Sequence, residues 1–123
     1  MKIKLNIKPD EPTVNNRIYP KDVLLEAFAA KKEFPVVVDG CKLPNPSKIP
    51  INDIVGVTSL EINELNEIVG EVKIIHSPKY DLIKDIPNEK LTYTVCGFGR
   101  IQDNIVTNFQ LVFVSVGFGG VKK

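Results

Sequence analysis

The chain has 123 residues, of which 43% are hydrophobic, and its 16 basic and 15 acidic side chains leave a net charge of +1. This length and composition predict a single domain over residues 1–123. The balanced charge gives no electrostatic reason for binding nucleic acid or an anionic membrane surface. No apolar run approaches the ~20 residues that span a bilayer. We therefore expect neither nucleic acid nor a membrane as a partner.

The chain contains two cysteines, Cys41 and Cys96, and one histidine, His76. Two cysteines are too few for a disulfide scaffold or a structural zinc site, so we expect two reduced thiols. Catalytic zinc usually has two or three histidine ligands, and a single histidine argues against such a site. The sequence therefore predicts no metal and no cofactor.

The first predicted element is a strand over residues 2–8, in which charged and apolar side chains alternate. Period-two alternation places Ile3, Leu5 and Ile7 on one face, toward a core, and the lysines on the other. Lysines on an outer strand also discourage pairing with other chains. A polar connection over residues 9–19 follows.

A helix is predicted over about 20–32. Pro20 suits the first turn of a helix, and Lys31 and Lys32 suit the negative end of the helix dipole. Pro35 then ends the segment. The apolar side chains recur at helical spacing and predict a buried stripe: Val23, Leu24, Ala27, Phe28 and Ala30.

A short buried strand is predicted over residues 36–38, and the glycine and three prolines of 39–50 predict a loop. Residues 54–62 and 67–75 alternate like strands. The four residues 63–66 between them predict a hairpin connection.

Residues 77–84 predict a short helical turn. Ser77 is the residue type that caps a helix N-terminus, and Pro78 suits the first helical position.

Two further strands are predicted over 91–101 and 105–116, joined by residues 102–104. The glycine-rich and lysine-containing segment 117–123 predicts a flexible tail. The fold class is therefore mainly β (α+β). We expect a small antiparallel barrel-like sheet of about six or seven strands with one clear helix, at about 20–32.

Four strings of the chain are similar, in this order, to motifs of one known family. The string N-N-R-I-Y-P-K-D-V-L at 15–24 resembles the entry segment, which reads roughly N-x-N-x-R-x-Y-P-x-x-V-L, of the prohead (capsid maturation) protease family of tailed phages. Further likenesses to that family follow at 68–79, 94–100 and 109–116. The resemblance covers residues 15–116 and implies a prohead-protease-like fold.

The resemblance also indicates where catalytic residues would lie. The family's histidine, in a motif like G-E-x-x-H-P, falls on Gly40, and its nucleophilic serine falls in the string that contains Thr94 and Cys96. A nucleophile needs a base within about 2.6–3.2 Å, and glycine has no side chain to act as one. His76 with Cys96 or Ser115 is an alternative pair, although a thiol without a nearby base stays mostly protonated. We predict no catalytic residues.

These degenerate positions predict a structural protein of the virion and not an enzyme. We expect an auxiliary or decoration protein on the capsid exterior, assembled in the host bacterial cytoplasm. Its partners would be the major capsid protein and neighbouring copies of itself or other capsid proteins. The alternatives are a divergent prohead maturation protease with a serine or cysteine nucleophile, a scaffold-core protein, and a binding module without a capsid role.

Overall fold

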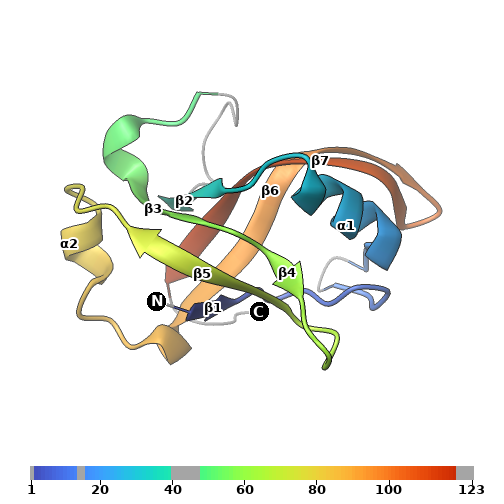
Figure 1. The fold of residues 1–123 in the computed structure, drawn as a ribbon, viewed down its shortest axis with the longest axis horizontal. Helices are drawn as coiled ribbons and strands as arrows, with labels where there is room; N and C mark the ends of the chain where they lie inside the picture. Colours follow the sequence, from blue (N-terminus) through green and yellow to red (C-terminus); the bar gives the residue numbers. More distant parts are fainter. Residues whose placement is uncertain (1, 14–15, 40–47, 119–123) are drawn as a thin grey trace.

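Seven strands form one curled sheet with a helix packed against it (Figure 1) in this computed structural model, which describes residues 2–13, 16–39 and 48–118. Paired strands follow the order β1-β5-β3-β2-β7-β6, and β4 pairs with β5 beside this path. The strands are β1 (Lys2–Lys4), β2 (Phe34–Val38), β3 (Ile54–Thr58), β4 (Glu61–Ile62), β5 (Ile68–Ile74), β6 (Leu91–Gln102) and β7 (Ile105–Phe118). The helices are α1 (Lys21–Ala29) and α2 (Tyr80–Ile83), with short 3-10 turns η2 (Ile51–Asp53) and η3 (Asn88–Lys90).

This architecture confirms the predicted fold class, a mainly β, barrel-like sheet with one main helix. One pairing corrects the expectation of an antiparallel sheet, because β2 and β7 run parallel, with Val36 opposite Val114 and Val38 opposite Val116. Parallel neighbours need a long connection. The four strands β3 to β6 and α2 lie between β2 and β7 in the chain and provide that connection.

The two ends of the sheet meet just after β1. The N–H of Leu5 donates to the carbonyl of Ile68 in β5 at 2.8 Å, and the N–H of Asn6 donates to the carbonyl of Tyr93 in β6 at 2.9 Å. Since β1 and β6 stand at opposite ends of the strand order, the second bond joins them across the seam of a half-barrel. The hydrophobic core lies inside this curl.

The N-terminal stretch has the faces that its alternation predicts, although the strand is shorter. Ile3, Leu5 and Ile7 are buried, and the residues that alternate with them are exposed: Lys2, Lys4, Asn6 and Lys8. Strand β1 ends at Lys4 because the chain passes from β5 to β6 immediately afterwards and changes its hydrogen-bonding partner. The predicted strand 2–8 is therefore too long.

Helix α1 packs its predicted apolar stripe into the core. Leu24, Ala27 and Phe28 are buried there, while Ala30 lies beyond the helix end and is exposed. Burial of this stripe holds α1 against the sheet, beside β7 (Figure 1).

The helix is shorter at both ends than the predicted 20–32. Pro20 is its N-cap, with extended backbone at ψ 145°, and not its first helical residue. The carboxylate of Asp10 accepts the N–H of Lys21 at 3.0 Å, so a residue distant in the chain caps the helix. At the other end the chain leaves the helix after Ala29 so that Phe34, which is 1% exposed, can enter β2.

Strand β2 begins two residues before the predicted strand 36–38 and contains Pro35, which we expected to end the helical segment. Pro35 lies opposite Val57 of β3, whereas pairing with β7 starts only at Val36. Proline is tolerated at that point because only β3, among the described strands, pairs with β2 there and the missing N–H interrupts no second ladder.

The segment that precedes α1 is hydrogen-bonded through Ile18 to the tip of the β6–β7 hairpin. The N–H of Ile18 donates to the carbonyl of Asn104, and the N–H of Val106 donates to the carbonyl of Ile18, both at 2.8 Å. The ring of Tyr19 meets Phe109 of β7 edge to face, with centroids 5.5 Å apart. Ile18 and Tyr19 therefore connect the start of α1 to the sheet.

The predicted strand 54–62 is divided into β3 and β4. The hydroxyl of Thr58, a buried residue, donates to the carbonyl of Ser59 at 2.8 Å. Such local bonds compete with ladder pairing, and the ladder resumes only at Glu61. The predicted strand 67–75 is present as β5, one residue shorter at each end.

The predicted strands 91–101 and 105–116 are present as β6 and β7 and pair along their whole length. Their connection is Asp103 and Asn104 alone and not 102–104. Both residues have positive φ, 53° and 68°, as a two-residue type I′ turn requires. The strands therefore stay paired up to the turn.

The predicted turn 77–84 is present, but the prediction of Ser77 as its cap is wrong. Helix α2 begins at Tyr80 with Lys79 as N-cap, so Pro78 precedes it. Ser77 contributes its carbonyl, which accepts the N–H of Tyr80 at 3.0 Å. Its hydroxyl is buried and has no hydrogen-bond partner in the described part of the chain.

Two predicted segments lie partly outside the described residues. Residues 117 and 118 of the predicted tail 117–123 complete β7 opposite Thr92 and Leu91, and the rest of the tail is not described. Residues 40–47 of the predicted loop 39–50 also lie outside the described residues. No helix within the described ranges is long and apolar enough to cross a membrane.

Candidate functional site

The candidate site is the outer face of three neighbouring strands, β2, β7 and β6. On the inner face Val36 and Val114 lie in register and belong to the core. Side chains alternate along a strand. The next residues, Val37, Ser115 and Thr94, therefore form a row across the opposite, outer face.

Cys96 lies on this same face, two residues beyond Thr94 and opposite Phe113. Its side chain is half-buried. Ser115 is only 3% exposed, and Thr94 is half-buried. The outer face thus brings together two hydroxyls and one thiol, which are the residue types that can act as nucleophiles when a base activates them.

The end of β2 is the position at which the resemblance expects a base. The N–H of Asp39 donates to the carbonyl of Val116 at 2.8 Å, and Val116 pairs with Tyr93. Through Val116, the C-terminal end of β2 is therefore aligned with Tyr93 of β6, which is three residues before Cys96. Gly40, the predicted position of the family's histidine, lies outside the described residues.

His76 lies elsewhere in the fold. It is exposed, follows the end of β5, and its ring packs edge to face against Tyr80 with centroids 5.0 Å apart. Strands β3 and β2 stand between β5 and β7 in the sheet order, and across the seam the N-terminal segment stands between β5 and β6. Strand pairing therefore does not bring His76 beside Cys96 or Ser115.

A concave region lies at the seam between β1 and β6. The cavity has a volume of about 670 Å³ and is lined by both apolar and charged residues. Burial raises the pKa of the Tyr93 hydroxyl, which lines it, above the ordinary value of 10.0. The other lining residues are Lys2, Ile3, Lys4, Ser59, Glu61, Val69, Gly70, Glu71, Glu89 and Leu91.

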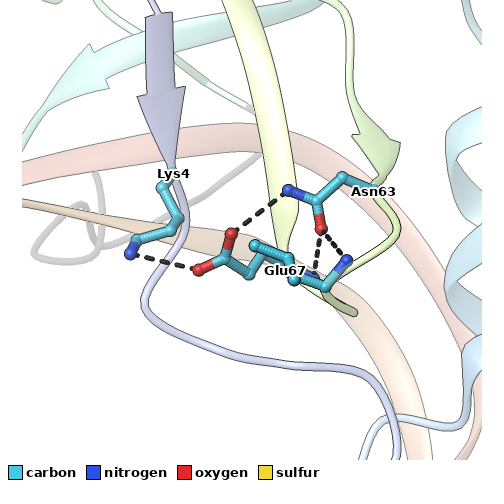
Figure 2. Close-up of polar contacts among 4 residues, drawn as sticks. Lys4, Asn63 and Glu67 are labelled. Carbon is cyan, nitrogen blue, oxygen red and sulfur yellow. Dashed lines mark hydrogen bonds and ion pairs between the residues drawn. The ribbon is translucent and has the colours of Figure 1, made fainter.

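A polar cluster beside this cavity fixes the turn between β4 and β5 (Figure 2). The carboxylate of Glu67 accepts hydrogen bonds from the Asn63 amide at 3.1 Å and from Lys4 at 3.2 Å. These two donors lower the pKa of the Glu67 carboxyl below its ordinary value of 4.5. The Asn63 oxygen accepts the backbone N–H groups of Leu65 and Glu67. The cluster therefore joins β1 to the turn and is structural.

The described residues contain no group of three or more histidine, cysteine, aspartate or glutamate side chains placed to hold a metal ion.

Two polar contacts were not predicted from the sequence. The cap that Asp10 supplies to α1 has no local sequence signal, because a cap from 11 residues away depends on the fold. The Asn63 cluster has a local signal, since asparagine side chains often bond nearby backbone N–H groups in turns.

The curled seven-stranded sheet and its one main helix define a prohead-protease-like fold. One protein with this likeness is the capsid assembly protease gp21 of bacteriophage T4. Its solved structure matches with a TM-score of 0.71 and 18% sequence identity, covering 96% of this chain and 81% of that chain. At this identity the likeness shows the fold alone. No protein-family model matches the chain, and no curated protein matches it.

Proposed function

We propose that this chain is a noncatalytic component of a tailed-phage head. In this proposal it is an auxiliary or decoration protein on the capsid exterior that contacts the major capsid protein and neighbouring copies. The fold shared with a capsid assembly protease supports the link to heads. Many weak contacts repeated over a symmetric shell would give such a protein a high total affinity.

One observation argues against catalysis by this chain. The outer face of β2, β7 and β6 holds the hydroxyls of Thr94 and Ser115 and the thiol of Cys96, but the only histidine of the chain follows β5. Proton abstraction needs a base within about 2.6–3.2 Å of the nucleophile. Strands β3 and β2 separate β5 from β7 in the sheet order, and the N-terminal segment separates β5 from β6 across the seam, which argues against His76 as that base.

The rival function is a divergent prohead maturation protease, which the likeness to a protease favours. In that case Cys96 or Ser115 would be the nucleophile. Incubation of the purified protein with the major capsid and scaffolding proteins of its phage distinguishes the two, with cleavage read by intact-protein mass spectrometry. We expect no cleavage. Cleavage that is lost in Cys96→Ala or His76→Ala, and kept in the exposed control variant Thr107→Ala, would overturn the proposal.

The position of the protein in the assembly pathway provides the second test. Proheads and mature heads are purified and their protein content is quantified by mass spectrometry. A decoration protein is expected in mature heads, unprocessed and in many copies. A protein that is present in proheads and absent from mature heads would instead be a scaffold-core protein, and one absent from both would have no capsid role.

A further inference from the structure

The outer edge of β6 is the feature that the proposed function does not use. β6 stands at one end of the strand order and pairs with β7 on its inner edge. On its outer edge the carbonyl of Tyr93 accepts the N–H of Asn6 at the seam. Beyond Tyr93, none of the described strands pairs with this edge.

The bond from Asn6 shows which backbone groups point outward. In a strand the N–H and C=O of one residue point to the same side, and the side alternates with each residue. Because the carbonyl of Tyr93 points to the outer edge, the backbone groups of Val95, Gly97, Gly99 and Ile101 point there too. The register with β7 shifts twice along the hairpin, but the extra residues belong to β7, so β6 keeps its period of two.

The composition of this edge is unusual for an unprotected strand. Proteins guard edge strands with charges, prolines or bulges, and β1, at the other end of the sheet, has exposed Lys2 and Lys4. Over residues 94–102 the single charge is Arg100. Phe98 is 46% exposed and Ile101 is 47% exposed. The two bulges of this hairpin lie in β7, so the edge of β6 keeps its period of two. An edge of this kind with exposed apolar side chains is suited to strand addition.

We propose that two copies of this chain pair through β6, antiparallel, about a two-fold axis at Phe98. In this register Phe98 stacks on the partner's Phe98, and Val95 lies opposite the partner's Ile101. Gly97 lies opposite the partner's Gly99. The four outward residues then form four hydrogen-bonded pairs, with two bonds each, or roughly eight backbone bonds. The two seven-stranded sheets become one continuous sheet.

The register follows from the edge itself. Phe98 is the midpoint of 94–102, the stretch between the seam and the turn. Pairing about it sets apolar residues against apolar ones and Thr94 against the partner's Gln102. It also sets Arg100 against the partner's Cys96, so no like charges meet. A two-fold axis at Gly97 would instead require Tyr93, whose carbonyl already binds Asn6.

Disulfide trapping tests this register. The variant Arg100→Cys, made with Cys41→Ser, keeps Cys96, and the pair would lie about 4.5 Å apart between Cα atoms, within disulfide reach. Under mild oxidation we expect a covalent dimer linked from Cys96 to the cysteine introduced at position 100 of the other copy. The control is Asn108→Cys in the same background, because Asn108 is exposed and lies opposite Arg100 on β7. Equal cross-linking of both variants would overturn the proposal.

Sedimentation equilibrium of the reduced protein tests the dimer without a cross-link. We expect the wild type to dimerise and Phe98→Lys, which places two like charges on the axis, to raise the dissociation constant at least about tenfold. Leu65→Lys, at a 74% exposed position in the β4–β5 turn, should leave it unchanged. A monomeric wild type, or a Phe98→Lys dimer of wild-type affinity, would refute the pairing. Capture of a different protein by this edge in monomeric wild type would refute it as well. None of these outcomes depends on the proposed capsid role.

Discussion

Gly56 is a position at which the packing between β3 and β5 leaves little room. A Cβ atom added there would lie 2.6 Å from Cγ1 of Val72 and 2.8 Å from the carbonyl oxygen of Lys73. Nonbonded carbon contacts are normally about 3.5–4.0 Å, so an alanine requires the two strands to separate by roughly 1 Å. Gly56 is buried between paired strands on both sides, and its neighbours have little freedom to move.

For Gly56→Ala we expect a loss of about 1–3 kcal/mol in the free energy of unfolding, the usual cost of overpacking. At this chain length each kcal/mol lowers the melting temperature by roughly 3–6 °C. Urea unfolding followed by far-UV circular dichroism measures the loss. Gly117→Ala is the matched control, because the nearest atom to its Cβ would be the Thr92 carbonyl oxygen at 4.0 Å, and its stability should change by less than about 0.5 kcal/mol. Equal stabilities for the two variants would show that our account of β3–β5 packing is wrong.

Three further changes have defined outcomes. Leu24→Ala should lower the free energy of unfolding by about 2–5 kcal/mol, because the Leu24 side chain is fully buried between α1 and the sheet. Leu25→Ala should lower it much less, because Leu25 is 47% exposed. Comparable losses for the two variants in urea unfolding would contradict the placement of the helix. The lowered pKa of Glu67 means that its ionised form adds stability above the unfolded pKa of about 4.3, and that this stability is lost as the pH falls through the folded pKa. The stability difference between wild type and Glu67→Gln should therefore be larger at pH 7 than at pH 3, and a constant difference would argue against the carboxylate's role. Asn104→Gly should retain or increase stability and Asn104→Ala should reduce it by about 1 kcal/mol, since φ is 68° there; the opposite order of melting temperatures would exclude the left-handed turn.

Patterns confined to neighbouring residues made much of this fold predictable. The alternation of Ile3, Leu5 and Ile7 identified their buried face, because a strand has a period of two whatever it pairs with. The spacing of Leu24 and Phe28 identified the buried side of α1 in the same way. Element ends were less accurate, since they depend on where the chain must turn to reach its next partner.

The features that we could not predict join residues far apart in the chain. Nothing near Val36 indicates that it lies parallel to Val114. The row of Val37, Ser115 and Thr94 exists only because two independent registers align three strands. The sequence could therefore identify residues of the types that act as nucleophiles. Their positions relative to His76 could not be predicted, because these depend on the order of the strands in the sheet.

The parallel contact between β2 and β7 also has a consequence for how the chain acquires its structure. It joins residues 36–38 to residues 114–116, so β2 has no permanent neighbour on that side until residues 114–116 have left the ribosome. Closing so large a loop is entropically costly and slows folding. A nascent chain should form the antiparallel β3–β5 pair early, and become protease-resistant only after β7 has emerged.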